Sequence, residues 1–110
     1  MTQDAIRPSR LFLTTCPDEP SAESLARALV ERRLAACVNI VPGVRSFYRW
    51  EGEIHDDGEL LLLIKTAASV DALRAAIDEL HPYDVPELAA LEIADGSPAY
   101  LRWVAENSAG

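Results

Sequence analysis

The sequence is poor in the residues from which catalytic and metal centres are usually built. In 110 residues it has two cysteines, Cys16 and Cys37, and two histidines, His55 and His81. It contains no GxGxxG, GxxxxGKS/T or GxSxG motif, so the common dinucleotide, nucleoside triphosphate and serine-hydrolase sites have no support. The spacing of either cysteine from His81 gives no indication of a nucleophile and its base. We therefore expect a protein that is not an enzyme.

Positive charge is scarce as well. The 18 acidic residues outnumber the 10 lysines and arginines, and the formal net charge is -8. Binding to nucleic acid requires a basic surface that neutralises phosphates, so nucleic acid is not an expected partner. An acidic surface instead attracts cations and favours solubility.

Long apolar segments are absent too. The longest aliphatic run, Leu60–Ile64, is far too short to span a membrane. The first residues lack the apolar core of a secretion signal. The spacing of Cys16 and Cys37 fits no zinc motif. We therefore expect no membrane contact, a cytoplasmic location and two free thiols.

What the sequence does contain is a regular succession of strand and helix patterns. Runs of β-branched, aromatic and aliphatic residues bounded by turn residues predict strands over Leu11–Thr15, Ala36–Trp50, Glu53–Thr66 and Leu88–Ile93. Apolar residues at helical spacing, each set preceded by a serine that can cap the helix, predict helices over Ala22–Arg33, Val70–Leu80 and Pro98–Val104. For the first of these helices the predicted capping residue is Ser21.

The order of these elements indicates the fold class. A strand, a helix, two strands, a helix and a strand make a split β-α-β, ferredoxin-like α+β fold, here with an additional C-terminal helix. We expect an antiparallel sheet with the helices on one face, and one domain over residues 1–110. The polar residues 1–9 are expected to be flexible.

The two central strands predict a hairpin of unusual length that turns at Glu51-Gly52. Pro42-Gly43 inside its first strand indicates a bulge or an edge position. The acidic run that opens the second strand, including Glu59, is interpreted as a solvated strand end. An overhanging hairpin with unpaired edges needs a cover, and another copy of the chain is the simplest one.

Five segments carry a resemblance to a known family. They follow one another in the order Leu34–Ile40, Ser46–Gly52, Ile64–Thr66, His81–Glu87 and Tyr100–Trp103. In this order they are similar to the CutA family of divalent-cation tolerance proteins, and the similarity covers nearly all of the chain from Leu11 to Val104. The resemblance implies a homotrimer whose long hairpins join the sheets of neighbouring subunits. Interface candidates are Phe47, Tyr48 and Trp50.

The resemblance also implies a link to copper and other divalent cations. The copper-linked member of the family has a cysteine near the end of the first strand and two adjacent histidines before Pro-Tyr. Here Thr14 aligns with that cysteine, and Cys16 follows two residues later on the same face of the strand. Leu80 replaces the first histidine and His81 matches the second. Cys16 and His81 are therefore the candidate ligands of a weakly bound Cu or Zn ion, whose softer character suits thiolate and imidazole.

A second function stays open. The trimers of this family resemble the PII signalling proteins in architecture, so the chain is alternatively a signalling or interaction scaffold that binds a small ligand or partner in clefts between subunits. Lys65, Tyr83 and Glu87 are the residues expected to contribute to such a cleft, together with Trp50.

Overall fold

Four strands form one antiparallel sheet in the order β2–β3–β1–β4. The computed structural model describes residues 7–108, in which the elements follow as β1 (Arg10–Cys16), α1 (Glu19–Glu31), β2 (Cys37–Trp50), β3 (Glu53–Thr66), α2 (Val70–Leu80), β4 (Ala89–Glu92) and α3 (Pro98–Glu106). This order and topology confirm the predicted ferredoxin-like α+β fold. Of the segment expected to be flexible, residues 1–6 lie outside the described part.

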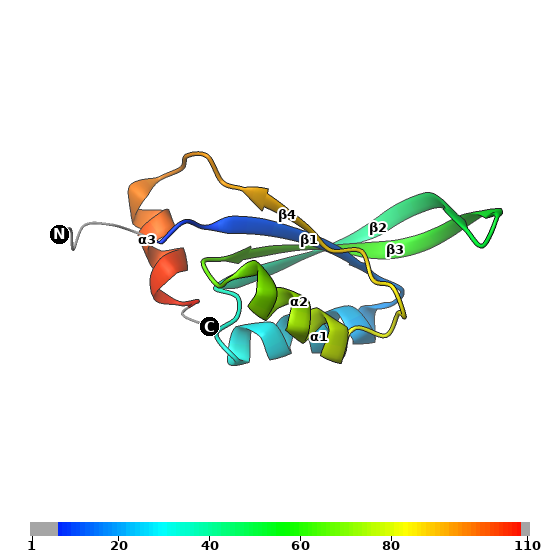
Figure 1. Cartoon of the computed structure of the whole chain (residues 1–110), viewed down its shortest axis with the longest axis horizontal. Helices are drawn as coiled ribbons and strands as arrows, with labels where there is room; N and C mark the ends of the chain where they lie inside the picture. The colour runs from blue at the N-terminus through cyan, green and yellow to red at the C-terminus, as the bar shows by residue number, and fades with distance from the viewer. Residues whose placement is uncertain (1–6, 109–110) are drawn as a thin grey trace.

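Hydrogen bonds join the start of the described chain to residues near its C-terminal end. The Arg7 guanidinium donates hydrogen bonds to the carbonyl oxygens of Ala67, Ala105 and Ser108 at 3.4, 2.9 and 3.2 Å. The carbonyl of Ser9 accepts from the backbone N–H of Ile93 at 3.3 Å. These contacts fix α3 at the end of the sheet where β1 begins (Figure 1).

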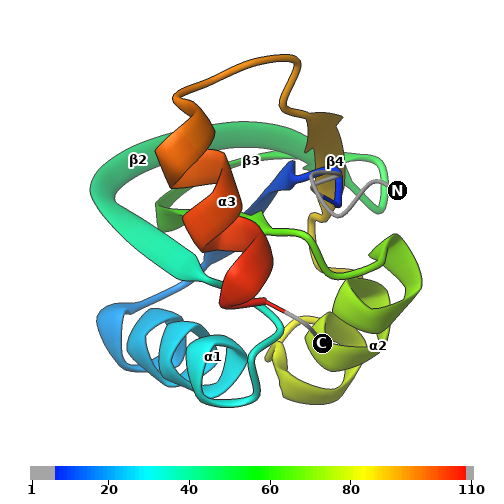
Figure 2. The same cartoon turned by 90° about the vertical axis from the view of Figure 1, so that its left-hand side faces the viewer.

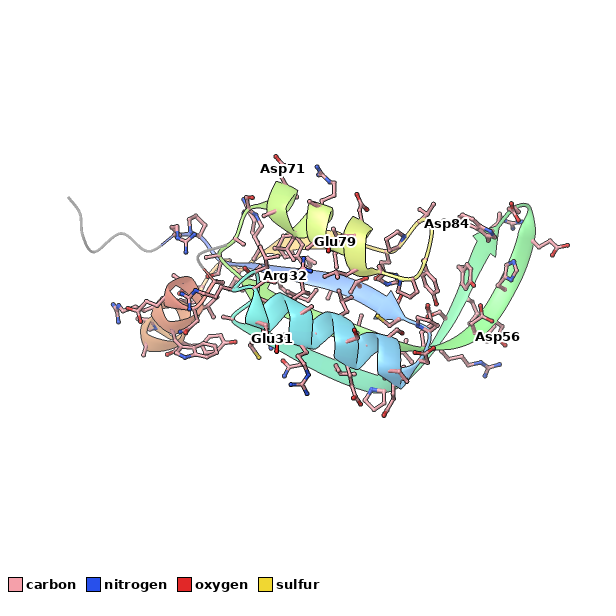
Figure 3. The ribbon with its side chains drawn as sticks, turned by 90° about the horizontal axis from the view of Figure 1, so that it is seen from below. Glu31, Arg32, Asp56, Asp71, Glu79 and Asp84 are labelled. Carbon is pink, nitrogen blue, oxygen red and sulfur yellow. The ribbon has the colours of Figure 1, made fainter. Side chains whose placement is uncertain are left out.

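Helices α1 and α2 lie side by side under one face of the sheet (Figures 1 and 2). Ser69 caps α2 as predicted, because its hydroxyl accepts from the N–H of Ala72. The predicted cap of α1 is wrong: Asp18 is the capping residue, and its carboxylate accepts from the N–H of Ser21 at 2.9 Å. Pro20 therefore lies inside the first helical turn, where a missing N–H costs nothing. Arg32 and Glu79 join the ends of the two helices at 3.0 Å (Figure 3).

The core fills the space between the sheet and these two helices. Strands β1 and β3 contribute side chains that are completely buried, among them Phe12, Leu62 and Ile64. The helices meet them with Leu29 and Leu73, which are also completely buried. Each such side chain stabilises the fold by roughly 1.5–3 kcal/mol relative to an exposed position.

The opposite face of the sheet is largely apolar, and no helix within residues 7–108 covers it. Side chains alternate along a strand, so the neighbours of Phe12 and Leu62 point away from the helices. In register these are Leu11 beside Leu91 and Lys65, Leu13 beside Leu63, and Val41 beside Leu61. All of these aliphatic side chains are partly or largely exposed. We call this surface, made by Leu11, Leu13, Val41, Leu61, Leu63 and Leu91, the open face.

The hairpin of β2 and β3 has the predicted length, with 14 residues in each strand. Glu51 and Gly52 both have positive φ values, 51° and 81°, as a tight two-residue hairpin turn requires. The register shifts between Val41 and Val44, which confirms the predicted bulge at Pro42-Gly43. Beyond this point the hairpin leaves the sheet and extends past the helices (Figure 1), and the chain measures 53 × 25 × 23 Å.

None of the helices in residues 7–108 has the length and apolar character needed to cross a membrane.

Candidate functional site

A cleft of about 760 Å³ lies where the hairpin leaves the sheet. One wall is the hairpin and the other is residues 82–87, the segment that follows α2. Figure 3 labels Asp84 on that segment and Asp56 on the hairpin opposite. A volume of this size matches sites that take small organic molecules.

The cleft is aromatic and acidic. Its lining includes four aromatic side chains, Phe47, Tyr48, Trp50 and Tyr83. It also includes three carboxylates, Glu59, Asp84 and Glu87. No lysine, arginine or histidine is among the described residues that line it. The local electrostatic potential therefore favours a ligand with positive charge.

Glu59 and Tyr83 join the two walls. The Tyr83 hydroxyl donates to the Glu59 carboxylate at 2.7 Å. Burial, this hydrogen bond and the charge of Glu59 raise the pKa of Tyr83, so the hydroxyl keeps its proton and remains a donor. Glu59 is only 9% exposed, and the prediction that it belongs to a solvated strand end is therefore wrong.

His81 holds the second wall in place. Its Nε2 lies 2.7 Å from the carbonyl oxygen of Thr15, and its Nδ1 lies 3.1 Å from the backbone nitrogen of Tyr83. A carbonyl only accepts hydrogen bonds, so Nε2 carries the hydrogen and Nδ1 accepts from the Tyr83 N–H. His81 thus ties the end of α2 to β1 and fixes the backbone that presents Tyr83 to the cleft.

The structure brings the two predicted metal ligands together. The Cys16 sulfur lies 3.8 Å from His81 Nε2, although 65 positions separate the two residues. A thiol at the end of a strand, such as that of Cys16 at the end of β1, can be accessible to solvent. The Cys16 side chain is instead completely buried. Burial raises the pKa of the thiol to about 11, and the charges of Asp18 and Glu59 act in the same direction.

The Cys16–His81 pair does not form a ready metal site. A cysteine ligand binds as the thiolate, which the raised pKa disfavours. Both imidazole nitrogens of His81 already make hydrogen bonds. The Thr14 hydroxyl is buried without a hydrogen-bond partner, but it is a poor ligand beside a thiol and an imidazole. Within residues 7–108, no group of three Cys, His, Asp or Glu side chains is placed to hold an ion.

The state of Cys16 leads to a pH prediction. The folded pKa of about 11 exceeds the ordinary 9.0, so the unfolded chain loses the thiol proton first as the pH rises. The stability that this difference provides is complete below pH 9.0 and is lost as the pH rises to about 11. Denaturant unfolding should therefore show a stability loss over this range that is smaller in Cys16→Ala. Equal losses in the two proteins would contradict the assigned state of Cys16.

The remaining predicted residues divide into two groups. Glu87, Tyr83 and the hairpin aromatics line the cleft. Lys65 instead lies on the side of the sheet that carries the open face, where its ammonium donates to the Asn39 side-chain oxygen and lies 3.6 Å from the Cys37 sulfur.

Two acidic residues of the cleft, Glu59 and Asp84, were not among the predicted site residues. The signal for Glu59 is its position directly before the buried Leu60, and the signal for Asp84 is its position within the His81–Glu87 segment.

The fold and the cleft define a class: a ferredoxin-like α+β protein with an extended hairpin and an acidic, aromatic cleft at its base. The family described as CutA1 divalent ion tolerance protein matches residues 10–107. The chain belongs to this CutA1 family.

Relatives in bacteria, animals and plants resemble the chain. It is 55% identical over 99 residues to the divalent-cation tolerance protein CutA of Thermus thermophilus, covering 89% of this chain and 96% of that protein. It is 50% identical to Protein CutA of Mus musculus over 82% of this chain, which is 51% of the mouse protein. The crystal structure of CutA1 from Oryza sativa superposes with a TM-score of 0.89 at 42% identity, covering 94% of this chain and 95% of that one.

Proposed function

We propose that this chain is a non-catalytic homotrimer that acts in divalent-cation tolerance and binds cations such as copper or zinc weakly through the carboxylates of its cleft. The observation that carries the assembly is the open face. Six aliphatic side chains share one sheet surface, two of them exposed and four partly exposed, and an apolar patch of this kind marks an association site. The protruding hairpin adds strand edges that a neighbouring copy would cover.

The cation part of the proposal is supported by charge. Glu59, Asp84 and Glu87 line the cleft without a basic side chain among the described residues. Carboxylate oxygens bind divalent cations, and the binding is weak where fewer than three ligands converge. The name of the Thermus relative, a divalent-cation tolerance protein, agrees with this role. The free thiols of Cys16 and Cys37 support a reducing, cytoplasmic location.

Isothermal titration calorimetry with Cu(II) and Zn(II) tests the proposed cation site. Asp84→Asn combined with Glu87→Gln should weaken binding by about tenfold, because it removes two of the three charges from the cleft. Cys16→Ala should leave the affinity unchanged. The control is Glu31→Gln, which removes an exposed acid at the end of α1. Binding that Cys16→Ala abolishes would move the site to the buried pair, and an absence of binding would contradict the proposal.

A second function is favoured by the size and lining of the cleft. The cleft volume of about 760 Å³ is larger than a bare ion needs, and its four aromatic side chains suit an organic ligand. A trimeric scaffold that binds a small molecule in this cleft is therefore the alternative to a cation-tolerance role. Thermal-shift screening separates the two functions. Organic ligands should raise the melting temperature of a small-molecule scaffold, whereas only metal ions should raise that of a cation-tolerance protein.

A further inference from the structure

We propose that the cleft is a binding site for a small organic ammonium ion. The inference rests on the second proposed function and names the chemical class of its ligand. Two features of the cleft support it: aromatic rings whose faces attract cations, and carboxylates that have no cationic partner.

One hairpin ring, that of Phe47, already shows this chemistry. The Arg45 guanidinium lies over the Phe47 ring, with its carbon 5.0 Å from the ring centroid. Tyr48 is stacked on His55 with centroids 5.2 Å apart. Trp50 has no such partner among residues 7–108, and in a single copy of the chain it is 44% exposed at the cleft. Because indole is the aromatic ring that binds cations best, Trp50 is the natural platform for an ammonium group.

The carboxylates of the cleft lack counter-ions. The ion pairs in the described part of the chain are Arg32–Glu79, Arg45–Asp56 and Arg74–Asp71, and none of them lies in the cleft lining. Glu59 is the informative case, since it is 9% exposed and its carboxylate is hydrogen-bonded, among the described residues, only to the Tyr83 hydroxyl. A carboxylate so far removed from water is rarely left without a cation. The lining therefore provides carboxylates and the uncovered Trp50 ring, while among residues 7–108 the nearby Arg45 is paired with Asp56 and no basic side chain belongs to the lining.

The same features favour an organic cation over a bare metal ion as the main occupant. A tightly bound metal ion needs three or more converging ligands, which the described residues do not supply. An ammonium ion with methyl or methylene groups needs fewer. Its charge is satisfied by one or two carboxylates, and its carbon atoms are desolvated by aromatic and proline side chains such as Trp50, Tyr83 and Pro86.

Two matched probes test the proposal: choline, a quaternary ammonium alcohol, and dimethylbutanol, in which a carbon atom replaces the charged nitrogen. Binding is measured by NMR titration of the full chain in the presence of a metal chelator. Choline should bind saturably, and dimethylbutanol should bind at least about tenfold more weakly, because only choline interacts with the carboxylates and with the ring quadrupole. Equal affinities, or no choline binding, would overturn the proposal.

Variants locate the site. Trp50→Leu and Asp84→Asn should each weaken choline binding about five- to tenfold. The control is Trp103→Leu on α3, since Trp103 has the same 44% exposure as Trp50 but does not line the cleft. Asp84 is exposed, so its variant keeps the test valid if removal of Trp50 disturbs folding. Choline affinity that is unchanged in both cleft variants would contradict the assigned site.

The outcomes separate this inference from the proposed functions. Choline binding without Cu(II) or Zn(II) binding would support the ammonium site and overturn the cation-tolerance proposal. Binding of Cu(II) or Zn(II) by a trimer that does not bind choline would support the cation-tolerance proposal and overturn the ammonium site. A trimer in which Trp50 is protected from solvent and choline does not bind would show that a second copy fills the cleft, and it would overturn the inference.

Discussion

Leu63→Glu is expected to convert the proposed trimer into monomers. Leu63 lies on β3 at the centre of the open face, opposite Leu13 on β1 and Asn39 on β2. In a trimer that covers this face, the new carboxylate would be buried without a partner, which costs several kcal/mol. Light scattering after size-exclusion chromatography should show the mass falling from three copies to a single copy of 12.0 kDa.

The control for this change is Val30→Glu. Val30 lies on α1 and is 44% exposed, so it offers the same gain of charge at an exposed apolar position far from the open face. Its oligomeric state should not change. An unchanged mass for Leu63→Glu would show that the open face is not the association surface, and dissociation of both variants would show a nonspecific effect of added charge.

Phe12→Ala is expected to lower the free energy of unfolding by about 3–5 kcal/mol. Phe12 is completely buried between the sheet and the two helices, beside Ile64 on β3. Its removal leaves a cavity that the surrounding backbone cannot close, because the strand is hydrogen-bonded on both sides. Such a loss is a large part of the roughly 5–15 kcal/mol that stabilises a typical domain. Denaturant unfolding in the monomeric Leu63→Glu background measures it without a contribution from dissociation.

The adjacent residue provides the comparison. Leu13 is one position along the same strand and points to the open face, where it is only partly buried. In the monomeric background Leu13→Ala should cost far less than Phe12→Ala, because its side chain has few neighbours in a single copy. In the otherwise unmodified protein, the same change should weaken assembly. Similar losses for the two substitutions in the monomer would contradict the assignment of the two faces.

Much of the fold could be predicted because periodicity and turn chemistry are local. Glu51-Gly52 predicted the hairpin turn and Ser69 the start of α2, and both follow from backbone preferences of one or two residues. The start of α1 was mispredicted for a local reason as well. Pro17 and Pro20 flank Asp18, and proline there is compatible both with the end of a strand and with the first turn of a helix.

The site was predictable in outline and not in detail. Cys16 ends β1 and His81 follows α2, and in a split β-α-β fold these points meet at one end of the sheet. The state of each side chain depends on contacts between distant segments. The hydrogen bond of His81 to Thr15 forms when the end of α2 packs against β1, and the hydrogen bond of Tyr83 to the nearly buried Glu59 forms when residues 82–87 fold against the hairpin. Alternation along a strand contains no information about such a contact, so Glu59 was interpreted as solvated.

Sedimentation equilibrium of the unmodified protein at micromolar concentration tests the account most directly. The proposed homotrimer, which is supported by the apolar open face and the overhanging hairpin, predicts one species with three times the 12.0 kDa mass of a single chain. A stable species with the mass of one chain would contradict the account, because the open face would then be exposed to water without a partner.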